Sequence, residues 1–350
     1  MHGSPDVNGP GAKSGHLFGH RVVGIGLALI LFEIVLRSLA YGVPTLDPRR
    51  GWIYRDRTVR HLLSEGHGVS HWDSSGNRES PFRPKAASMR FLAIGDSMTE
   101  ALQVSDAEVF TARLELALQH VEWPAAVLNA GRSSLSIADY IATAQSDRDD
   151  FHPAWTIVQL RLDDLTTDCR IRARTHFIDD RAGLRIEVVP PRFGRLTALL
   201  FKLRGWSALI DRTIARASAF NTASKLPPMF RGGTSTPPPA VSGVSPDYPI
   251  EEELAMLASA WGGRLTIALI PDATGTQGDV EKRVLAYCRE RRISVVNMRE
   301  TFPRFDRDQM SPFGFPNSEY GTGHLNARGH EALALLLVTE LEGLRARGLF

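Results

Sequence analysis

The stretch 90–99 constrains the fold more than any other part of the chain. Four apolar residues at 91–94 stand between a charged residue and a glycine, a pattern typical of a short buried strand. Gly95 ends this pattern, and Asp96 and Ser97 follow where a helix or a tight turn should begin. The Ser97 hydroxyl is therefore predicted at the carboxyl end of a strand, where open α/β sheets bind their ligands. Taken alone, the same residues would also suit a helix N-cap.

Strands and helices are predicted to alternate from residue 89 onward. The predicted strands are 89–94, 125–128, 155–162, 265–270 and 293–297, and the predicted helices are 110–120, 137–144, 250–261, 280–291 and about 327–345. This alternation favours an α/β fold, a parallel sheet with helices on both faces. The pattern lapses at 170–250, where we expect an inserted hairpin at 176–189, an amphipathic helix near 196–217 and a mobile Pro/Gly/Ser-rich loop at 227–249.

Three segments precede the alternating part, which we take as one domain over 89–350. Residues 1–21 are rich in Gly, Ser and His and are predicted to be a disordered tail. Residues 22–43 are almost all apolar and, at about 33 Å as a helix, would cross a bilayer. Glu33 and Arg37 interrupt this run at a spacing that lets them pair. We expect a transmembrane anchor here, with a cleaved signal peptide and an amphipathic core helix as alternatives. Residues 44–88 are predicted to be an extended lead-in.

Charge and cysteine content exclude some classes of function. The net charge is +2 and no block of like charges stands out, so nucleic acid is not an expected partner. Five arginines lie within 49–60, directly after the apolar segment, and the positive-inside rule would place the following domain in the cytoplasm. Cys169 and Cys288 do not have a metal-ligand spacing, and the sequence leaves open whether they pair.

Polar residues and glycines gather at the ends of the predicted strands. They form the segments 95–97, 129–131 and 161–164, and a fourth segment, 323–326, precedes the last helix. In a doubly wound sheet these ends converge on one crevice. A serine there, with a histidine from the C-terminal segment, is what nucleophilic acyl transfer needs, because the imidazole takes the hydroxyl proton and backbone N–H groups stabilise the oxyanion.

These segments resemble, in order, the sequence blocks of the SGNH (GDSL-type) hydrolases, specifically the branch with an N-terminal membrane segment. The first block is matched by Gly95-Asp96-Ser97-Met98-Thr99, the second by Asn129-Ala130-Gly131 and the fifth by 324–330. The third block of the family has Gly-x-Asn-Asp, and this chain has Leu160-Arg161-Leu162-Asp163-Asp164 at the corresponding place. The resemblance covers residues 22–345, interrupted by the insertion.

The resemblance implies a flavodoxin-like three-layer sandwich and a serine esterase without metal or cofactor. Ser97 would be the nucleophile and His324 the base. The N–H groups of Ser97 and Gly131 would form part of the oxyanion hole, with Asp163 at the third position. Substrates would be ester-linked acyl groups of an envelope glycan or a lipid-linked ester, outside the cytoplasmic membrane. An O-acyltransferase with the same site and an inactive polysaccharide-binding protein are the alternatives.

The sequence departs from the family at two places. Asp163 stands where the third block has an asparagine, so it would either donate a hydrogen bond in its protonated form or turn away to support His324. The family's acid lies two or three residues before the histidine, where this chain has Thr322 and Gly321. Glu319, Asp306 and Asp308 are candidate acids, and Asp96, Arg161 and Asp164 are further candidates for a supporting role.

Overall fold

A parallel five-stranded sheet forms the centre of the protein in a computed structural model. The structure describes residues 12–38, 45–47, 51–54, 58–62, 64–133, 135–162, 165, 175–180, 183–188, 207–210, 213, 249–271, 278–308 and 310–350. Its strands are β5 (Met89–Ile94), β6 (Ala125–Asn129), β7 (Trp155–Arg161), β10 (Leu265–Ile270) and β11 (Ser294–Asn297). They lie in the order β11-β10-β7-β5-β6, and every neighbouring pair is parallel.

The strand order confirms the flavodoxin-like arrangement. Counted along the chain within this sheet, the order from the β6 edge is 2-1-3-4-5, which is that of flavodoxin-like folds. The chain passes from β5 to β6 on one side and then returns to place β7 on the other side of β5. The carboxyl end of β5 is therefore the switch point of the sheet, where such folds bind ligands.

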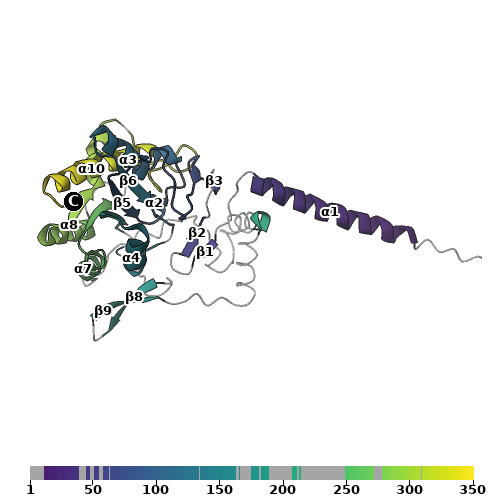
Figure 1. The fold of residues 1–350 in the computed structure, drawn as a ribbon, viewed down its shortest axis with the longest axis horizontal. Coiled ribbons are helices and arrows are strands. Elements are labelled where there is room, and N and C mark those ends of the chain that lie inside the picture. The colour runs from purple at the N-terminus through teal and green to yellow at the C-terminus, as the bar shows by residue number, and fades with distance from the viewer. Residues whose placement is uncertain are drawn as a thin grey trace, which may run out of the picture.

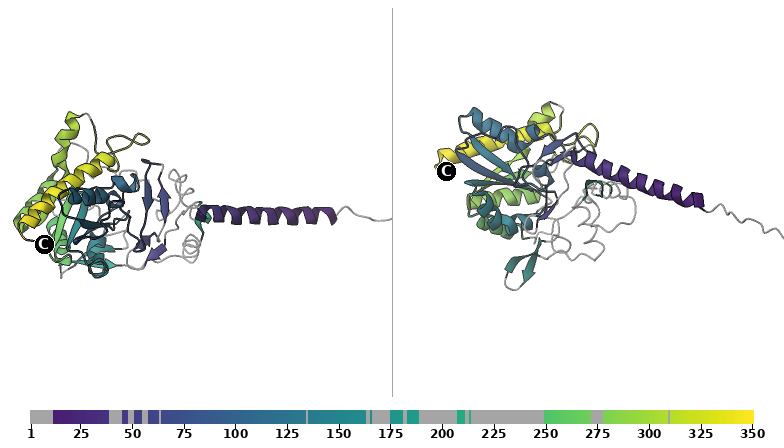
Figure 2. Two further views of the ribbon diagram at one scale, coloured as in Figure 1. Left: turned by 45° about the horizontal axis from the view of Figure 1, so that its top comes forward. Right: turned by 45° about the vertical axis from the view of Figure 1, so that its right-hand side comes forward.

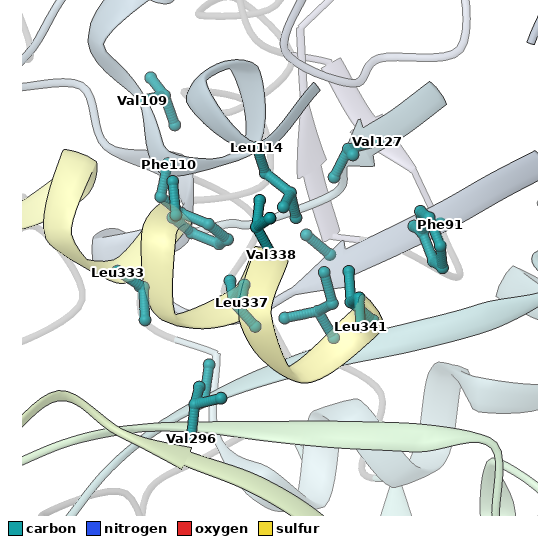
Figure 3. Close-up of a cluster of buried hydrophobic side chains, with 14 of the residues drawn as sticks. Phe91, Val109, Phe110, Leu114, Val127, Val296, Leu333, Leu337, Val338 and Leu341 are labelled. Atoms are coloured by element: carbon teal, nitrogen blue, oxygen red, sulfur yellow. The ribbon is translucent and has the colours of Figure 1, made fainter. Parts of the chain in front are cut away.

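Helices cover both faces of the sheet, as Figure 1 shows. The helices α3 (Phe110–His120) and α10 (Ala327–Ala346) pack on one face, and α4 (Ile137–Phe151), α7 (Ile250–Ala260) and α8 (Asp279–Arg291) on the other. Alternate residues of β5 enter the two cores, because successive side chains of a strand point to opposite faces. Phe91 belongs to the same core cluster as Leu114 and Leu337 (Figure 3), whereas Leu92 belongs to the opposite core.

Shorter elements complete the described part of the domain. They are the helix α2 (Ser97–Glu100), the 3-10 helices η1 (Asp106–Glu108) and η5 (Met298–Thr301), and the helix α9 (Phe302–Arg307). The hairpin predicted within the insertion is confirmed as β8 (Thr175–Asp180) paired with β9 (Gly183–Val188). The predicted helix 196–217 and loop 227–249 lie almost wholly outside the described residues, as does Cys169. Cys288 is buried in the core under α8, and burial raises the pKa of its thiol to about 12.

The N-terminal helix differs from the prediction in extent and character. The helix α1 spans Ala12–Ser38 and extends away from the α/β domain in all three views (Figures 1 and 2). Across the described residues, no helix is both long enough and apolar enough to cross a membrane, so the predicted span 22–43 is not found. Ionic side chains interrupt the apolar part of α1: Arg37 Nε lies 2.7 Å from Glu33 Oε1. Glu33 also accepts hydrogen bonds from Ala208 N (3.0 Å) and Leu209 N (2.9 Å).

The segment predicted as an extended lead-in contains two antiparallel strand pairs that precede β5. One joins β1 (Thr45–Asp47) to β2 (Gly51–Ile53), and the other joins β3 (Val59–His61) to β4 (Val69–His71). Arg78 then fastens this segment to the domain, because its buried guanidinium donates to Glu100 O (2.8 Å) and Val104 O (2.6 Å). The lead-in is therefore packed against the turn that follows α2.

Candidate active site

Ser97 begins the four-residue helix α2 directly after β5. The Asp96 carboxylate caps this helix by accepting a hydrogen bond from Met98 N at 2.8 Å, so the N-cap interpretation of Asp96 is confirmed. Gly95 is required at this turn, because a Cβ there would overlap Thr99 Oγ1 and lie 2.5 Å from Gln159 Oε1. The turn thus places the Ser97 hydroxyl at the carboxyl end of β5, as the sequence predicts.

His324 reaches the same point from the other end of the chain. Its Nε2 lies 2.9 Å from Ser97 Oγ, and its side chain is 11% exposed. Asn326 fixes the following residues, since its side chain caps α10 by accepting from Arg328 N and Gly329 N, both at 3.1 Å. The predicted pairing of Ser97 with His324 is therefore present in the structure.

The acid beside the imidazole is Glu65, a lead-in residue that the sequence analysis missed. Glu65 Oε2 lies 2.7 Å from His324 Nδ1, and Glu65 Oε1 accepts a hydrogen bond from His324 N at 3.0 Å. Both carboxylate oxygens thus contact one residue, although the two positions are 259 apart in sequence. Because an ionised carboxylate only accepts, Nδ1 carries the proton and Nε2 is free to accept one from Ser97.

Three glycines allow Glu65 to approach this closely. A Cβ at Gly323 would lie 2.6 Å from Glu65 Oε1. At Gly66 (φ +70°) and at Gly68, a Cβ would overlap the carbonyl oxygens of Gln103 and Leu102, respectively. These glycines are the sequence feature that could have indicated a close contact near Glu65. Gly66 and Gly68 lie in a segment without hydrophobic periodicity, so the sequence does not place them against the domain.

The environment of Glu65 favours its ionised form. Burial alone would raise the pKa of this carboxyl, but hydrogen bonds and charge from His324 outweigh burial, and a side-chain hydrogen bond from Gln103 adds to them. The net effect lowers the pKa below its ordinary value. An ionised carboxylate at this position orients the imidazole and stabilises the imidazolium form.

The two predicted oxyanion donors, the N–H groups of Ser97 and Gly131, differ in their hydrogen bonding. The Ser97 N–H has no hydrogen-bond acceptor among the described residues. Gly131 N donates to Asn129 Oδ1 at 3.0 Å. Gly131 is pressed against α2, because a Cβ there would lie 2.6 Å from Thr99 C and would overlap Glu100 N. The part of the chain that the structure describes does not include Asp163 or Asp164, so their predicted roles stay predictions.

Glu65, rather than one of the predicted carboxylates, contacts the imidazole. Glu319 is exposed on the loop before His324, and Asp306 and Asp308 are exposed at α9 and its end. Glu65 occupies the place for which these three carboxylates were considered. Arg161 is half-buried at the end of β7, in register with Ile270.

His330, in the first turn of α10, is a structural residue. It is fully buried and accepts a hydrogen bond from Phe110 N at 3.3 Å through Nδ1, at the start of α3. Burial and the nearby positive charges lower its pKa to about 3. It is therefore neutral at ordinary pH, and His324 is the imidazole available to Ser97.

Comparison with known proteins gives similarity of structure alone. No family model matches the chain, and no curated protein matches it. Several lipolytic proteins and esterases are among the solved structures similar to it. A member of the G-D-S-L lipolytic family from Veillonella parvula DSM 2008 is 11% identical, with 72% of this chain and 97% of that chain covered and a TM-score of 0.38.

Two esterases are similar to the same degree. The psychrotrophic esterase EstA from Pseudoalteromonas sp. is 8% identical, covering 74% of this chain and 100% of that chain, with a TM-score of 0.41. A catalytic mutant of an acetylxylan esterase from Geobacillus stearothermophilus is 14% identical, covering 73% and 95%, with a TM-score of 0.41. The activities in these names belong to those proteins.

Proposed function

We propose that this chain is a serine esterase of the SGNH type that hydrolyses ester-linked acyl groups. The observation that carries the proposal is the continuous relay from Ser97 Oγ through His324 to Glu65, with contacts of 2.9 and 2.7 Å. The relay lies at the switch point of a flavodoxin-like sheet, where such folds bind ligands. The matching sequence blocks support the same family.

In the first half of the proposed reaction, His324 Nε2 takes the proton of the Ser97 hydroxyl as Oγ attacks the ester carbonyl carbon. The carbonyl π bond opens, and its electron pair moves to the oxygen. The resulting oxyanion accepts a hydrogen bond from Ser97 N–H, and it accepts a second one from Gly131 N–H when that group releases Asn129 Oδ1. When the intermediate collapses, the C–O bond to the alcohol breaks, and the imidazolium gives its proton to the leaving oxygen.

In the second half, an acceptor hydroxyl resolves the acyl-enzyme on Ser97. His324 removes a proton from water, whose oxygen attacks the acyl carbon, and the carboxylic acid leaves as Ser97 regains its proton. A sugar hydroxyl in place of water would give an O-acyltransferase with the same side chains. Adding acceptor glycans to the assay distinguishes the two outcomes by the product formed.

Covalent labelling tests the proposal directly. A fluorophosphonate probe should label the wild-type protein, and Ser97→Ala should abolish the labelling and the hydrolysis of small acetyl esters while the thermal midpoint is unchanged. His324→Ala should lower both rates by several orders of magnitude. Labelling that persists in Ser97→Ala would refute the assignment of the nucleophile. An unlabelled wild-type protein that binds polysaccharide would instead support the inactive alternative.

We further propose an envelope glycan or lipid-linked ester as substrate and an extracytoplasmic location near a membrane. Exposed apolar side chains on α1, such as Val22, Leu29 and Phe32, support membrane association, and the family resemblance supports the location. The arginines at 49–60 argue for the opposite orientation. Reporter fusions at residue 60 and at the C-terminus test the location, and activity of a cytoplasm-only reporter at both points would refute it.

A further inference from the structure

The acid and the base of the relay are supplied by two different loops. Glu65 belongs to the lead-in loop 64–68 between β3 and β4, and His324 follows the loop 311–323 after α9. A separation of 259 positions means that no local turn fixes the carboxylate relative to the imidazole. Contacts between the two loops must therefore set this geometry.

Asn317 makes a reciprocal contact between these loops. Its Oδ1 accepts a hydrogen bond from Gly66 N at 2.8 Å, and its Nδ2 donates to Gly66 O at 2.9 Å. One side-chain amide thus pairs with the N–H and the C=O of the residue that directly follows Glu65. This pairing fixes both the position and the rotation of the Gly66 backbone, because neither bond can form if the loop turns over.

The other side of the same loop is held by the backbone that follows α2. Gly66 packs so closely against Gln103 that a Cβ would overlap the Gln103 carbonyl oxygen and lie 3.0 Å from Phe315 Cδ1. Phe315 belongs to the loop of Asn317, so Gly66 lies between that loop and the segment after the nucleophile. A small movement of Gly66 would therefore displace the carboxylate next to it.

We propose that Asn317 is a positioning residue that holds the Glu65 carboxylate against His324 by clamping the Gly66 peptide. The expected effect on kcat rests on the proposed function. The clamp itself concerns only the geometry of Glu65 and His324. Asn317 is exposed and lies outside the matching blocks, seven residues before His324. A role confined to the folding of its own loop would leave the contact between Glu65 and His324 unchanged.

The test compares Asn317→Ala with Asn317→Asp and with Thr322→Ala in the full chain. Asn317→Asp keeps an acceptor for Gly66 N but loses the donor to Gly66 O. Thr322→Ala is the matched control, since within the described part of the chain its hydroxyl donates one hydrogen bond, to Glu319 O of the same exposed loop (3.3 Å). The readouts are kcat and KM for a small acetyl ester and the downfield proton resonance of His324 Nδ1–H, assigned by its loss in His324→Ala.

We expect Asn317→Ala to lower kcat by about 10- to 100-fold with KM unchanged, because a displacement of about 1 Å at a catalytic centre costs that much. The His324 Nδ1–H resonance should weaken or move upfield in Asn317→Ala, with Asn317→Asp intermediate and Thr322→Ala unchanged. A resonance and a kcat equal to those of wild type in Asn317→Ala would overturn the inference.

The resonance separates this inference from the proposed function. If the wild-type protein neither hydrolyses esters nor reacts with the fluorophosphonate, the esterase proposal fails. The clamp is still supported if the resonance changes in Asn317→Ala and not in Thr322→Ala, and it is refuted if the resonance does not change in Asn317→Ala.

Discussion

Replacing Glu65 by glutamine is the most informative perturbation of the proposed relay. The two side chains have nearly the same shape, but glutamine has one acceptor oxygen and one donor amide. Glu65 accepts from two donors of His324, its backbone N–H and its Nδ1–H. Glutamine can satisfy only one of them, so the substitution changes the hydrogen bonding without creating a cavity.

The magnitude follows from the tautomer that glutamine selects. If its oxygen accepts from His324 N, its NH₂ group faces Nδ1, and the ring proton moves to Nε2. The imidazole then cannot accept the Ser97 proton. A wrong tautomer of this kind costs about 10⁴-fold in kcat, which corresponds to about 5.5 kcal/mol in activation free energy. The fold should lose only about 2 kcal/mol, the contribution of hydrogen bonds to a charged group.

The assay measures hydrolysis of a small acetyl ester and fluorophosphonate labelling by wild type, Glu65→Gln and Glu319→Gln. Glu319 is the matched control, because its carboxylate lies on the loop before His324 but is exposed. We expect the rate to fall only in Glu65→Gln, with Glu65→Asp intermediate because its shorter side chain keeps the charge. Wild-type kcat/KM in Glu65→Gln, or a comparable loss in Glu319→Gln, would refute the assignment of the acid.

Two further predictions rest on the same geometry, and a third, on Asp163, rests on the sequence alone. Gly68→Ala should lower both the thermal midpoint and kcat, because its Cβ would overlap Leu102 O and lie 2.7 Å from Val104 O; a circular-dichroism melt and the ester assay check this. Because the pKa of Glu65 is lowered in the folded protein, the ionised carboxylate stabilises the fold at pH values above the ordinary carboxyl pKa. Thermal melts should therefore show wild type more stable than Glu65→Gln in that range, and the difference should disappear as the pH falls through the lowered pKa of Glu65. Asp163→Asn should preserve or raise ester hydrolysis, since a permanent donor replaces a conditional one, whereas a loss of about 10²-fold in the ester assay would refute the role of Asp163 as a protonated donor.

The sheet could be predicted because its strands carry a strong local signal. Residues 91–94 are apolar on both faces, as a strand buried between two helix layers requires, and the structure places successive residues in opposite cores. The helix α3 was predicted with its observed ends. The sequence does not predict the start of α1, because Ala12 lies in a Gly- and His-rich segment whose composition is typical of disorder.

Part of the site could be predicted for the same reason. Ser97 and His324 lie beside regular elements, one after β5 and the other before α10, so topology alone brings them to one edge of the sheet. Glu65 has no such neighbour in sequence. It lies in a loop between two three-residue strands, and hydrophobic periodicity cannot place so short a pair of strands against the domain.

The location of the acid follows from what the imidazole requires rather than from the position of a motif. Ser97 fixes Nε2 at one end of the ring, and the opposite nitrogen needs one oxygen that accepts its proton. Any segment that brings an acceptor oxygen within hydrogen-bond distance of Nδ1 can fill this role, and in this chain the lead-in does so through Glu65. The absence of a carboxylate at Thr322 and Gly321 therefore marks a displaced acid rather than a missing one. The matching blocks from residue 89 onward therefore do not contain the whole proposed site. Glu65, which contacts His324, and Arg78, which donates to Glu100 O at the end of α2, both precede β5.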